Sequence, residues 1–151
     1  NAGADLIVAH LREDRRHINE NDIANIIKNI NIPLQLEVAP TTFMFNFAIK
    51  NNIKKVCVVP EKRQELTTEG GLNIEYNLNF LKQNLPNLYK NNIEVSLFLD
   101  PNKENVNACI ELGVKAIEFH DTHGDVCPPN WEPGQKALKP NKDSLLSYHA
   151  D

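Results

Sequence analysis

Short apolar runs alternate with amphipathic stretches along most of this chain. Five runs have the length and aliphatic content of buried strands, and they lie at residues 6–10, 34–38, 56–59, 94–99 and 116–120. Between them, apolar residues recur at helical spacing in four stretches, at about residues 21–30, 41–51, 74–89 and 102–112. This alternation predicts an α/β fold in which right-handed crossovers join parallel strands.

Polar residues interrupt the apolar runs toward their carboxyl ends. Gln35 and Glu37 share one face of the second run, and Glu118 and His120 share one face of the last. Repeated βα units fit either an open doubly wound sheet or a closed (β/α)8 barrel, and periodicity does not separate the two. Because a barrel collects its site from several strand ends around one axis, the distribution favours a curved barrel wall with these groups on its concave side.

Composition excludes several classes of function. The 151 residues carry 16 Lys and Arg against 20 Asp and Glu, and no basic block occurs, so we expect no nucleic-acid partner. No apolar run approaches the roughly 18 residues of a membrane helix, so we expect no membrane partner. Cys57, Cys109 and Cys127 lack a CxxC pair, which predicts neither a disulfide framework nor a zinc site and favours a reducing, cytoplasmic compartment.

Two loops that follow predicted strands carry candidate chemistry. Residues 10–17 hold three arginines and two histidines, which indicates either a catalytic βα loop or a solvated, salt-bridged loop. Residues 60–72 form a long connection with adjacent glycines at Gly70 and Gly71, which indicates a substrate loop or lid, or else a long surface loop. Composition alone does not decide either case.

Four literal blocks of this sequence resemble the pyridoxine 5'-phosphate synthase family. In chain order they read AGADLIVAHLREDRRHI, LQLEVA, VPEKRQELTTEGGL and VSLFLD. Blocks of this length are far more specific than a lone glycine motif, and the resemblance extends over about residues 2–120. It implies a partial (β/α)8 TIM barrel, in which the five runs correspond to parallel strands 2–6 of the family barrel.

The resemblance also implies an activity. The family is a transferase of vitamin B6 biosynthesis that condenses 1-deoxy-D-xylulose 5-phosphate with 3-amino-2-oxopropyl phosphate to give pyridoxine 5'-phosphate, phosphate and water. It implies two phosphorylated small-molecule substrates, no metal and no organic cofactor. It further implies that the complete family enzyme is a homo-oligomer, an octamer.

Individual positions match functional residues of the family. His10 resembles a proton acceptor, Glu37 a second acid-base residue, and Glu118 a carboxylate that stabilises a transition state. Such groups suit the reaction, because closing an aromatic ring with loss of phosphate and water moves protons between carbon and oxygen in successive steps. For Glu37 the alternative is a carboxylate paired with a structural arginine. The positions that match substrate-binding residues are Arg12, His17 and Thr67.

The resemblance covers part of the family barrel. We expect residues 1–120 to form a partial synthase domain, and residues 121–151 to form an irregular or disordered tail that holds four of the nine prolines. The family's first strand, its last two strands and a later histidine have no counterpart, so we expect a fragment with half a site that is inactive by itself. The alternative function is an inactive βα-repeat remnant that only binds a phosphorylated ligand or other barrel segments.

Overall fold

A computed structural model describes residues 3–61, 70–120 and 145–147 of the chain. Its strands form one six-stranded sheet in the order β1-β2-β3-β4-β5-β6, and every neighbouring pair is parallel. The elements along the chain are β1 (Ile7–His10), α1 (Glu20–Asn29), β2 (Leu34–Val38), α2 (Thr42–Lys50), β3 (Lys55–Val58), α3 (Ile74–Lys90), β4 (Glu94–Leu99), α4 (Lys103–Leu112), β5 (Ala116–Phe119) and β6 (Leu145–Ser147). The predicted five parallel strands and four intervening helices are confirmed.

One strand was not predicted. Residues 145–147 form β6, which pairs in parallel with β5, although the sequence analysis placed them in an irregular tail. Three residues are too few to show an alternation of apolar and polar positions. The strand also forms by pairing with the backbone edge of β5, and a sequence pattern does not reveal that pairing. The remainder of the predicted tail, residues 121–144 and 148–151, lies outside the described residues.

Side-chain caps set where the helices begin. Asn19, Thr41, Asn73 and Asn102 each accept a hydrogen bond from a backbone N–H in the first turn of the helix that follows. α4 ends at Gly113, whose φ of 69° is left-handed and suits glycine. Each cap marks the end of the connection between a strand and the next helix. The caps therefore set how long these connections are, and the connections carry polar groups.

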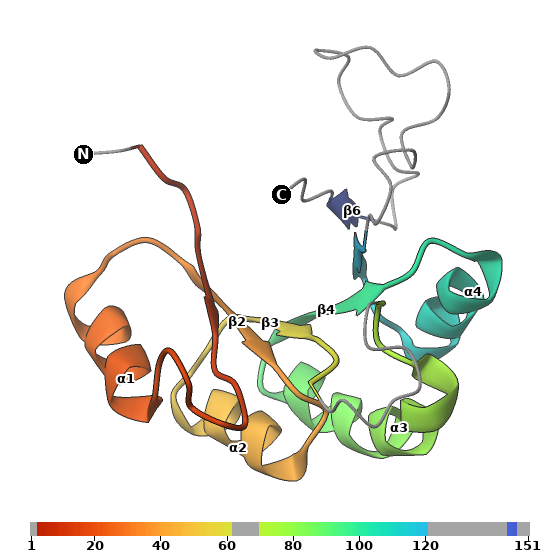
Figure 1. The fold of residues 1–151 in the computed structure, drawn as a ribbon, viewed down its shortest axis with the longest axis horizontal. Coiled ribbons are helices and arrows are strands. Elements are labelled where there is room, and N and C mark those ends of the chain that lie inside the picture. Colours follow the sequence, from red (N-terminus) through yellow and green to blue (C-terminus); the bar gives the residue numbers. More distant parts are fainter. Residues whose placement is uncertain (1–2, 62–69, 121–144, 148–151) are drawn as a thin grey trace.

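The two faces of the sheet differ in chemistry. All four described helices lie along one side of the sheet (Figure 1), and the strand residues on that side are aliphatic and buried. Neighbouring strands pair in register, so paired residues point to the same face. The aliphatic face includes Leu34, Leu36, Val38, Val56, Val58, Val95, Leu97, Leu99 and Ile117. The opposite face is polar, which is the inside–outside arrangement of a barrel wall.

One hydrogen bond demonstrates the curvature of this wall. Gln35 of β2 donates from Nε2 to Oε1 of Glu118 of β5 over 2.8 Å, although β3 and β4 lie between these strands. In a flat sheet the two backbones would be about 14 Å apart, at about 4.8 Å per strand spacing. The two side chains meet because they converge on the concave side, as the sequence analysis expected of a barrel wall.

No helix of the described residues is long and apolar enough to cross a membrane.

Candidate active site

A row of polar side chains crosses the concave face from β1 to β4. The strand register pairs His10 with Glu37, Glu37 with Cys57, and Cys57 with Ser96. Glu118 lies on β5 and is paired with Phe98, two residues beyond Ser96 on β4. Five strands therefore bring residues that are far apart in the sequence to one side of the sheet, near the carboxyl ends where barrel enzymes hold their sites.

His10 lies between two carboxylates. Its Nδ1 is 3.7 Å from Oε2 of Glu37, and its Nε2 is 2.8 Å from Oε1 of Glu61, which follows β3. The side chains of His10 and Glu37 are 27% exposed, whereas that of Glu61 is 4% exposed. His10 and Glu37 are therefore partly accessible, whereas Glu61 is almost completely buried.

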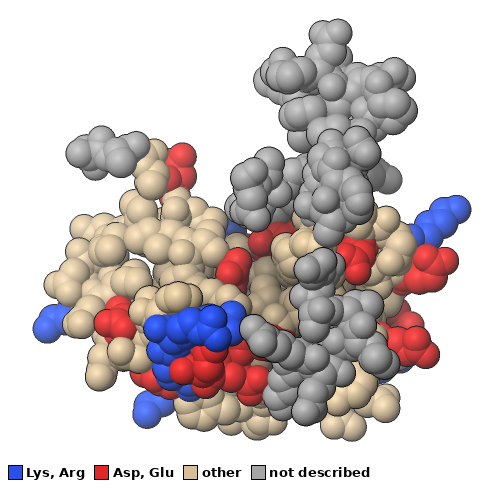
Figure 2. Space-filling view, viewed as in Figure 1, with Lys and Arg blue, Asp and Glu red and all other residues tan. Residues whose placement is uncertain are grey.

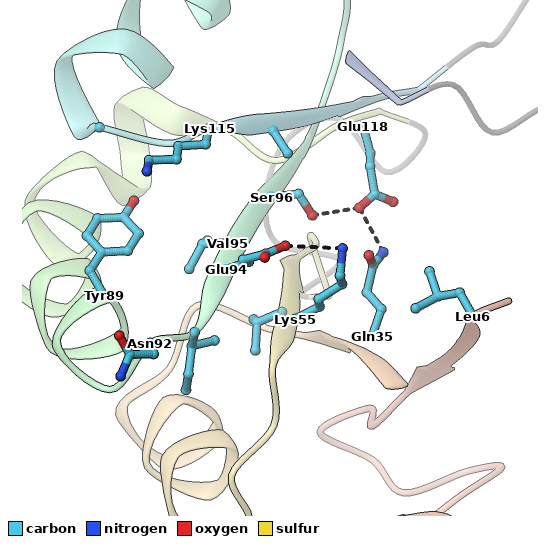
Figure 3. A pocket seen from close by; sticks show the side chains of 14 residues that line it. Leu6, Gln35, Lys55, Tyr89, Asn92, Glu94, Val95, Ser96, Lys115 and Glu118 are labelled. Atoms are coloured by element: carbon cyan, nitrogen blue, oxygen red, sulfur yellow. Dashed lines mark hydrogen bonds and ion pairs between the residues drawn. The ribbon is translucent and has the colours of Figure 1, made fainter. Parts of the chain in front are cut away.

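Glu118 is buried, and its donors among the described residues include Gln35 and Ser96. Its Oε1 accepts a hydrogen bond from Nε2 of Gln35 at 2.8 Å and another from Oγ of Ser96 at 2.6 Å, as Figure 3 shows. Hydrogen bonds of this kind offset the cost of removing a carboxylate from water. They also fix its orientation, so Glu118 presents a defined negative charge to the interior of the wall.

Cys57 lies between these carboxylates and is fully buried. Burial, together with the negative charge of Glu118, raises the pKa of the Cys57 thiol well above its usual value. The thiol is therefore protonated at neutral pH and unsuited to act as a nucleophile. Imidazole and carboxylate groups are therefore the candidates for proton transfer on the concave face.

The buried thiols make the stability of the chain depend on alkaline pH. Burial raises the pKa of Cys57 and raises that of Cys109 to about 12, whereas the usual value is 9.0. The unfolded chain therefore releases these protons first, so stability is complete below about pH 9 and falls above it. We expect the free energy of unfolding, measured by urea titration, to fall by about 3 kcal/mol between pH 8 and pH 10. A Cys57→Ala, Cys109→Ala variant should show a shallower fall, and an equal slope in both proteins would contradict this cause.

Ion pairs fill the loop after β1. Arg12 donates from Nε and Nη2 to the two carboxylate oxygens of Asp14, each at 3.0 Å, and this contact lowers the pKa of Asp14. Arg15 is paired with Glu20 at 2.6 Å. Figure 2 shows basic side chains directly beside acidic ones over this part of the molecule. The loop is thus salt-bridged, and a phosphate that binds the Nε–Nη2 edge of the Arg12 guanidinium must displace Asp14.

The described residues include Arg12 and His17 but not Thr67 among the predicted substrate-binding positions. His17 is exposed in the loop between β1 and α1. Thr67 and most of the predicted substrate loop, residues 62–69, lie outside the described residues. The roles of Arg12, His17 and Thr67 stay predictions.

The end of the predicted substrate loop is anchored to the carboxyl end of β4. The backbone N–H of Gly71 donates to Oδ1 of Asp100 at 2.9 Å, and that of Leu72 donates to the carbonyl oxygen of Phe98 at 2.7 Å. The same Oδ1 lies 3.2 Å from Nδ1 of His120. A Cβ on Gly71 would overlap the backbone nitrogen of Asp100, so only glycine permits this close approach.

A cavity of about 860 Å³ opens at the opposite end of the strands. Gln35, Ser96 and Glu118 are among the residues that line it. Lys55 and Glu94 also line it, and they form an ion pair in which Nζ and Oε2 are 3.1 Å apart (Figure 3). Most of its other lining residues precede or begin strands. Because barrel chemistry occurs at the carboxyl ends, we assign this cavity to the lower barrel interior and the candidate site to the level of His10 and Glu37.

The sequence patterns did not identify two polar residues of the concave face, Glu61 and Ser96. Glu61 follows Cys57 by four positions, so an extended chain puts both on one face, and Ser96 follows from the register of β4. Alternation continued past the end of β3 would have pointed to Glu61. Among the described residues, no group of three or more His, Cys, Asp or Glu is arranged to hold a metal ion.

The family model and the individual relatives that match this chain indicate the same family. The sequence model described as "Pyridoxal phosphate biosynthesis protein PdxJ" matches residues 1–140, which extends beyond the resemblance over about residues 2–120. The chain is 42% identical over 157 aligned positions to "Pyridoxine 5'-phosphate synthase" of Sulfurihydrogenibium sp. (strain YO3AOP1), covering 99% of this chain and 65% of that protein.

Other relatives carry the same name. Identity is 45% over 118 residues with the protein of Ehrlichia chaffeensis (strain ATCC CRL-10679 / Arkansas), covering 78% of this chain and 49% of the relative. It is 46% over 119 residues with that of Aquifex pyrophilus, covering 79% and 50%. The chain therefore spans between about half and two thirds of the length of these curated relatives.

Proposed function

Because this chain belongs to the pyridoxal phosphate biosynthesis protein PdxJ family, we propose that it contributes acid-base residues to an enzyme that makes pyridoxine 5'-phosphate. The substrates are 1-deoxy-D-xylulose 5-phosphate and 3-amino-2-oxopropyl phosphate. The observation that carries the proposal is the convergence of His10, Glu37 and Glu118, from three strands, on the concave face of the sheet. No contact among the described residues favours the alternative function, an inactive remnant that only binds a phosphorylated ligand or other barrel segments.

The three side chains suit different steps of this reaction. His10 and Glu37 are both partly accessible and lie 3.7 Å apart, so they can take and return protons on the same region of a bound substrate. Glu118 is buried and oriented by Gln35 and Ser96, so its negative charge is suited to stabilise positive charge on an amine nitrogen that condenses with a ketone. Different environments therefore support a division of roles among the three groups.

The reaction is tested in an enzyme of full family length that contains residues 1–120 of this chain, which we call the complete synthase. We expect its gene to restore growth without added pyridoxine to a bacterial strain that lacks its own pyridoxine 5'-phosphate synthase. A strain that carries the empty plasmid provides the control. If the complete synthase accumulates as folded protein and growth still requires pyridoxine, the proposed function is wrong.

Arg12 is proposed to bind substrate phosphate through its planar guanidinium. Replacing Arg12 with Lys keeps the charge but loses the two-pronged contact that Asp14 now occupies. We expect KM for one phosphorylated substrate to rise about tenfold while kcat changes little. Steady-state kinetics of the complete synthase measure both values. Arg16→Lys is the matched control, because the Arg16 side chain is 59% exposed; an unchanged KM in Arg12→Lys would remove Arg12 from the binding site.

Assembly and compartment belong to the same proposal. We infer an octamer in the cytoplasm from the family resemblance, with His17 and Thr67 completing the substrate contacts. Light scattering after size-exclusion chromatography of the complete synthase measures the assembly directly. A monomer at micromolar concentration would contradict the octamer without affecting the proposed reaction.

A further inference from the structure

We propose that Glu61 is a positioning residue that holds His10 with its ring proton on Nε2, so that Nδ1 is the nitrogen that accepts a proton from substrate. This inference rests on the proposed function only for the use that the enzyme makes of His10. The position of Glu61 itself follows from the contacts between the two side chains.

The contact joins two buried atoms. Nε2 of His10 lies 2.8 Å from Oε1 of Glu61, and both atoms are buried, with no hydrogen-bond partner elsewhere among the described residues. Polar atoms removed from water are normally satisfied by a partner, so each of these two atoms depends on the other. The angle at this distance falls outside the hydrogen-bond range, and catalytic hydrogen bonds often become aligned only when substrate binds.

The Glu61 carboxylate is anchored on its other side. Its Oε2 accepts a hydrogen bond from the backbone N–H of Glu13 at 2.6 Å. The carboxylate thus connects the end of β3 with the loop that follows His10 on β1. A side chain that is 4% exposed and hydrogen-bonded at Oε2 has little freedom, which is what a group that orients another side chain requires.

This arrangement selects one tautomer of His10. A neutral imidazole carries one N–H, and a carboxylate beside Nε2 favours the form in which the proton is on Nε2. The lone pair is then on Nδ1, whose neighbour at 3.7 Å is Oε2 of Glu37. The proton of the substrate is therefore taken up on the side of the ring where Glu37 lies, and the resulting imidazolium is flanked by Glu37 and Glu61.

Substitution of Glu61 separates orientation from folding. Glu61→Gln keeps the shape, and the backbone N–H of Glu13 requires the amide oxygen at the position of Oε2. The amide NH2 then lies beside Nε2 and donates to it, which favours the opposite tautomer with the proton on Nδ1. We expect kcat of the complete synthase to fall by about 10² or more, with KM changed less than about threefold. Glu61→Asp restores a carboxylate and should recover at least about tenfold of the lost kcat.

Glu111→Gln is the matched control. It also removes a carboxylate from an ion pair, with Lys82 at 2.6 Å, but on exposed helix surfaces away from the concave face. We expect its kinetic constants to equal those of the unmodified enzyme. If Glu61→Gln behaves like Glu111→Gln, or if kcat is equal in Glu61→Asp and Glu61→Gln, the inference is overturned.

A spectroscopic measurement makes the test independent of activity. In the 151-residue chain labelled with ¹⁵N-histidine, the ring-nitrogen shifts of neutral His10 should report a proton on Nε2, and Glu61→Gln should move it toward Nδ1. A proton on Nδ1 in the unmodified chain would overturn the inference even if Glu61→Gln fails to fold. The expected tautomer without any product from the complete synthase would instead contradict the proposed function and leave the role of Glu61 standing.

Discussion

Replacing Glu37 with Gln should lower kcat of the complete synthase by about 10² or more, while KM for either substrate changes less than about threefold. Gln has nearly the shape of Glu but cannot accept a proton at neutral pH. Glu37 is partly exposed beside His10 and on the concave face, so the loss affects proton transfer rather than the fold. Steady-state formation of pyridoxine 5'-phosphate measures the change.

Glu94→Gln provides the control for this variant. Glu94 is also a strand residue, but it lies at the amino end of β4, and its side chain is 75% exposed beside Lys55. Its removal should leave kcat within about twofold, since exposed ion pairs contribute little. If Glu37→Gln keeps nearly full turnover, Glu37 is a structural carboxylate, as the alternative interpretation of the sequence held.

Replacing Gly71 with Ala should destabilise the fold by about 3 kcal/mol, because overpacking against rigid atoms forces the backbone to move. The added Cβ would overlap the backbone nitrogen of Asp100 and the Cα of Leu99. The movement also strains the two hydrogen bonds that anchor the loop, from Gly71 to Asp100 and from Leu72 to Phe98. Urea unfolding of the chain measures the loss.

Gly70→Ala is the neighbouring comparison. There the nearest atom to an added Cβ is Oδ2 of Asp100, at 3.1 Å, and that side chain can rotate away. We expect a loss of less than about 1 kcal/mol. Equal stabilities of Gly70→Ala and Gly71→Ala would show that the loop end is not fixed against β4 as described.

The alternation of apolar and polar residues was sufficient to predict the main elements. The aliphatic faces of β2, β3 and β4 pack against helices, and this burial makes their period visible in the sequence. The helix starts were also predictable within a residue or two, because Asn19, Thr41, Asn73 and Asn102 are standard capping types. β6 could not be predicted, since its register comes from the edge of β5.

The candidate site was predictable only in part, for a physical reason. Strand alternation puts Glu37 and Glu118 on the concave face, and the structure agrees. The hydrogen bond from Gln35 to Glu118 depends on the curvature of the sheet, which no local pattern encodes. The pair between Arg12 and Asp14 depends on a loop in which Arg15 has a φ of 52°, a conformation that composition does not reveal.

The most direct test of the proposed function is product formation by the purified complete synthase. The enzyme is supplied with both phosphorylated substrates, and mass spectrometry and a phosphate assay follow pyridoxine 5'-phosphate and inorganic phosphate together. The proposal predicts both products in a one-to-one ratio, with a rate about 10² or more lower in Glu37→Gln. If the folded enzyme forms no pyridoxine 5'-phosphate from these substrates, the function proposed for His10, Glu37 and Glu118 is wrong.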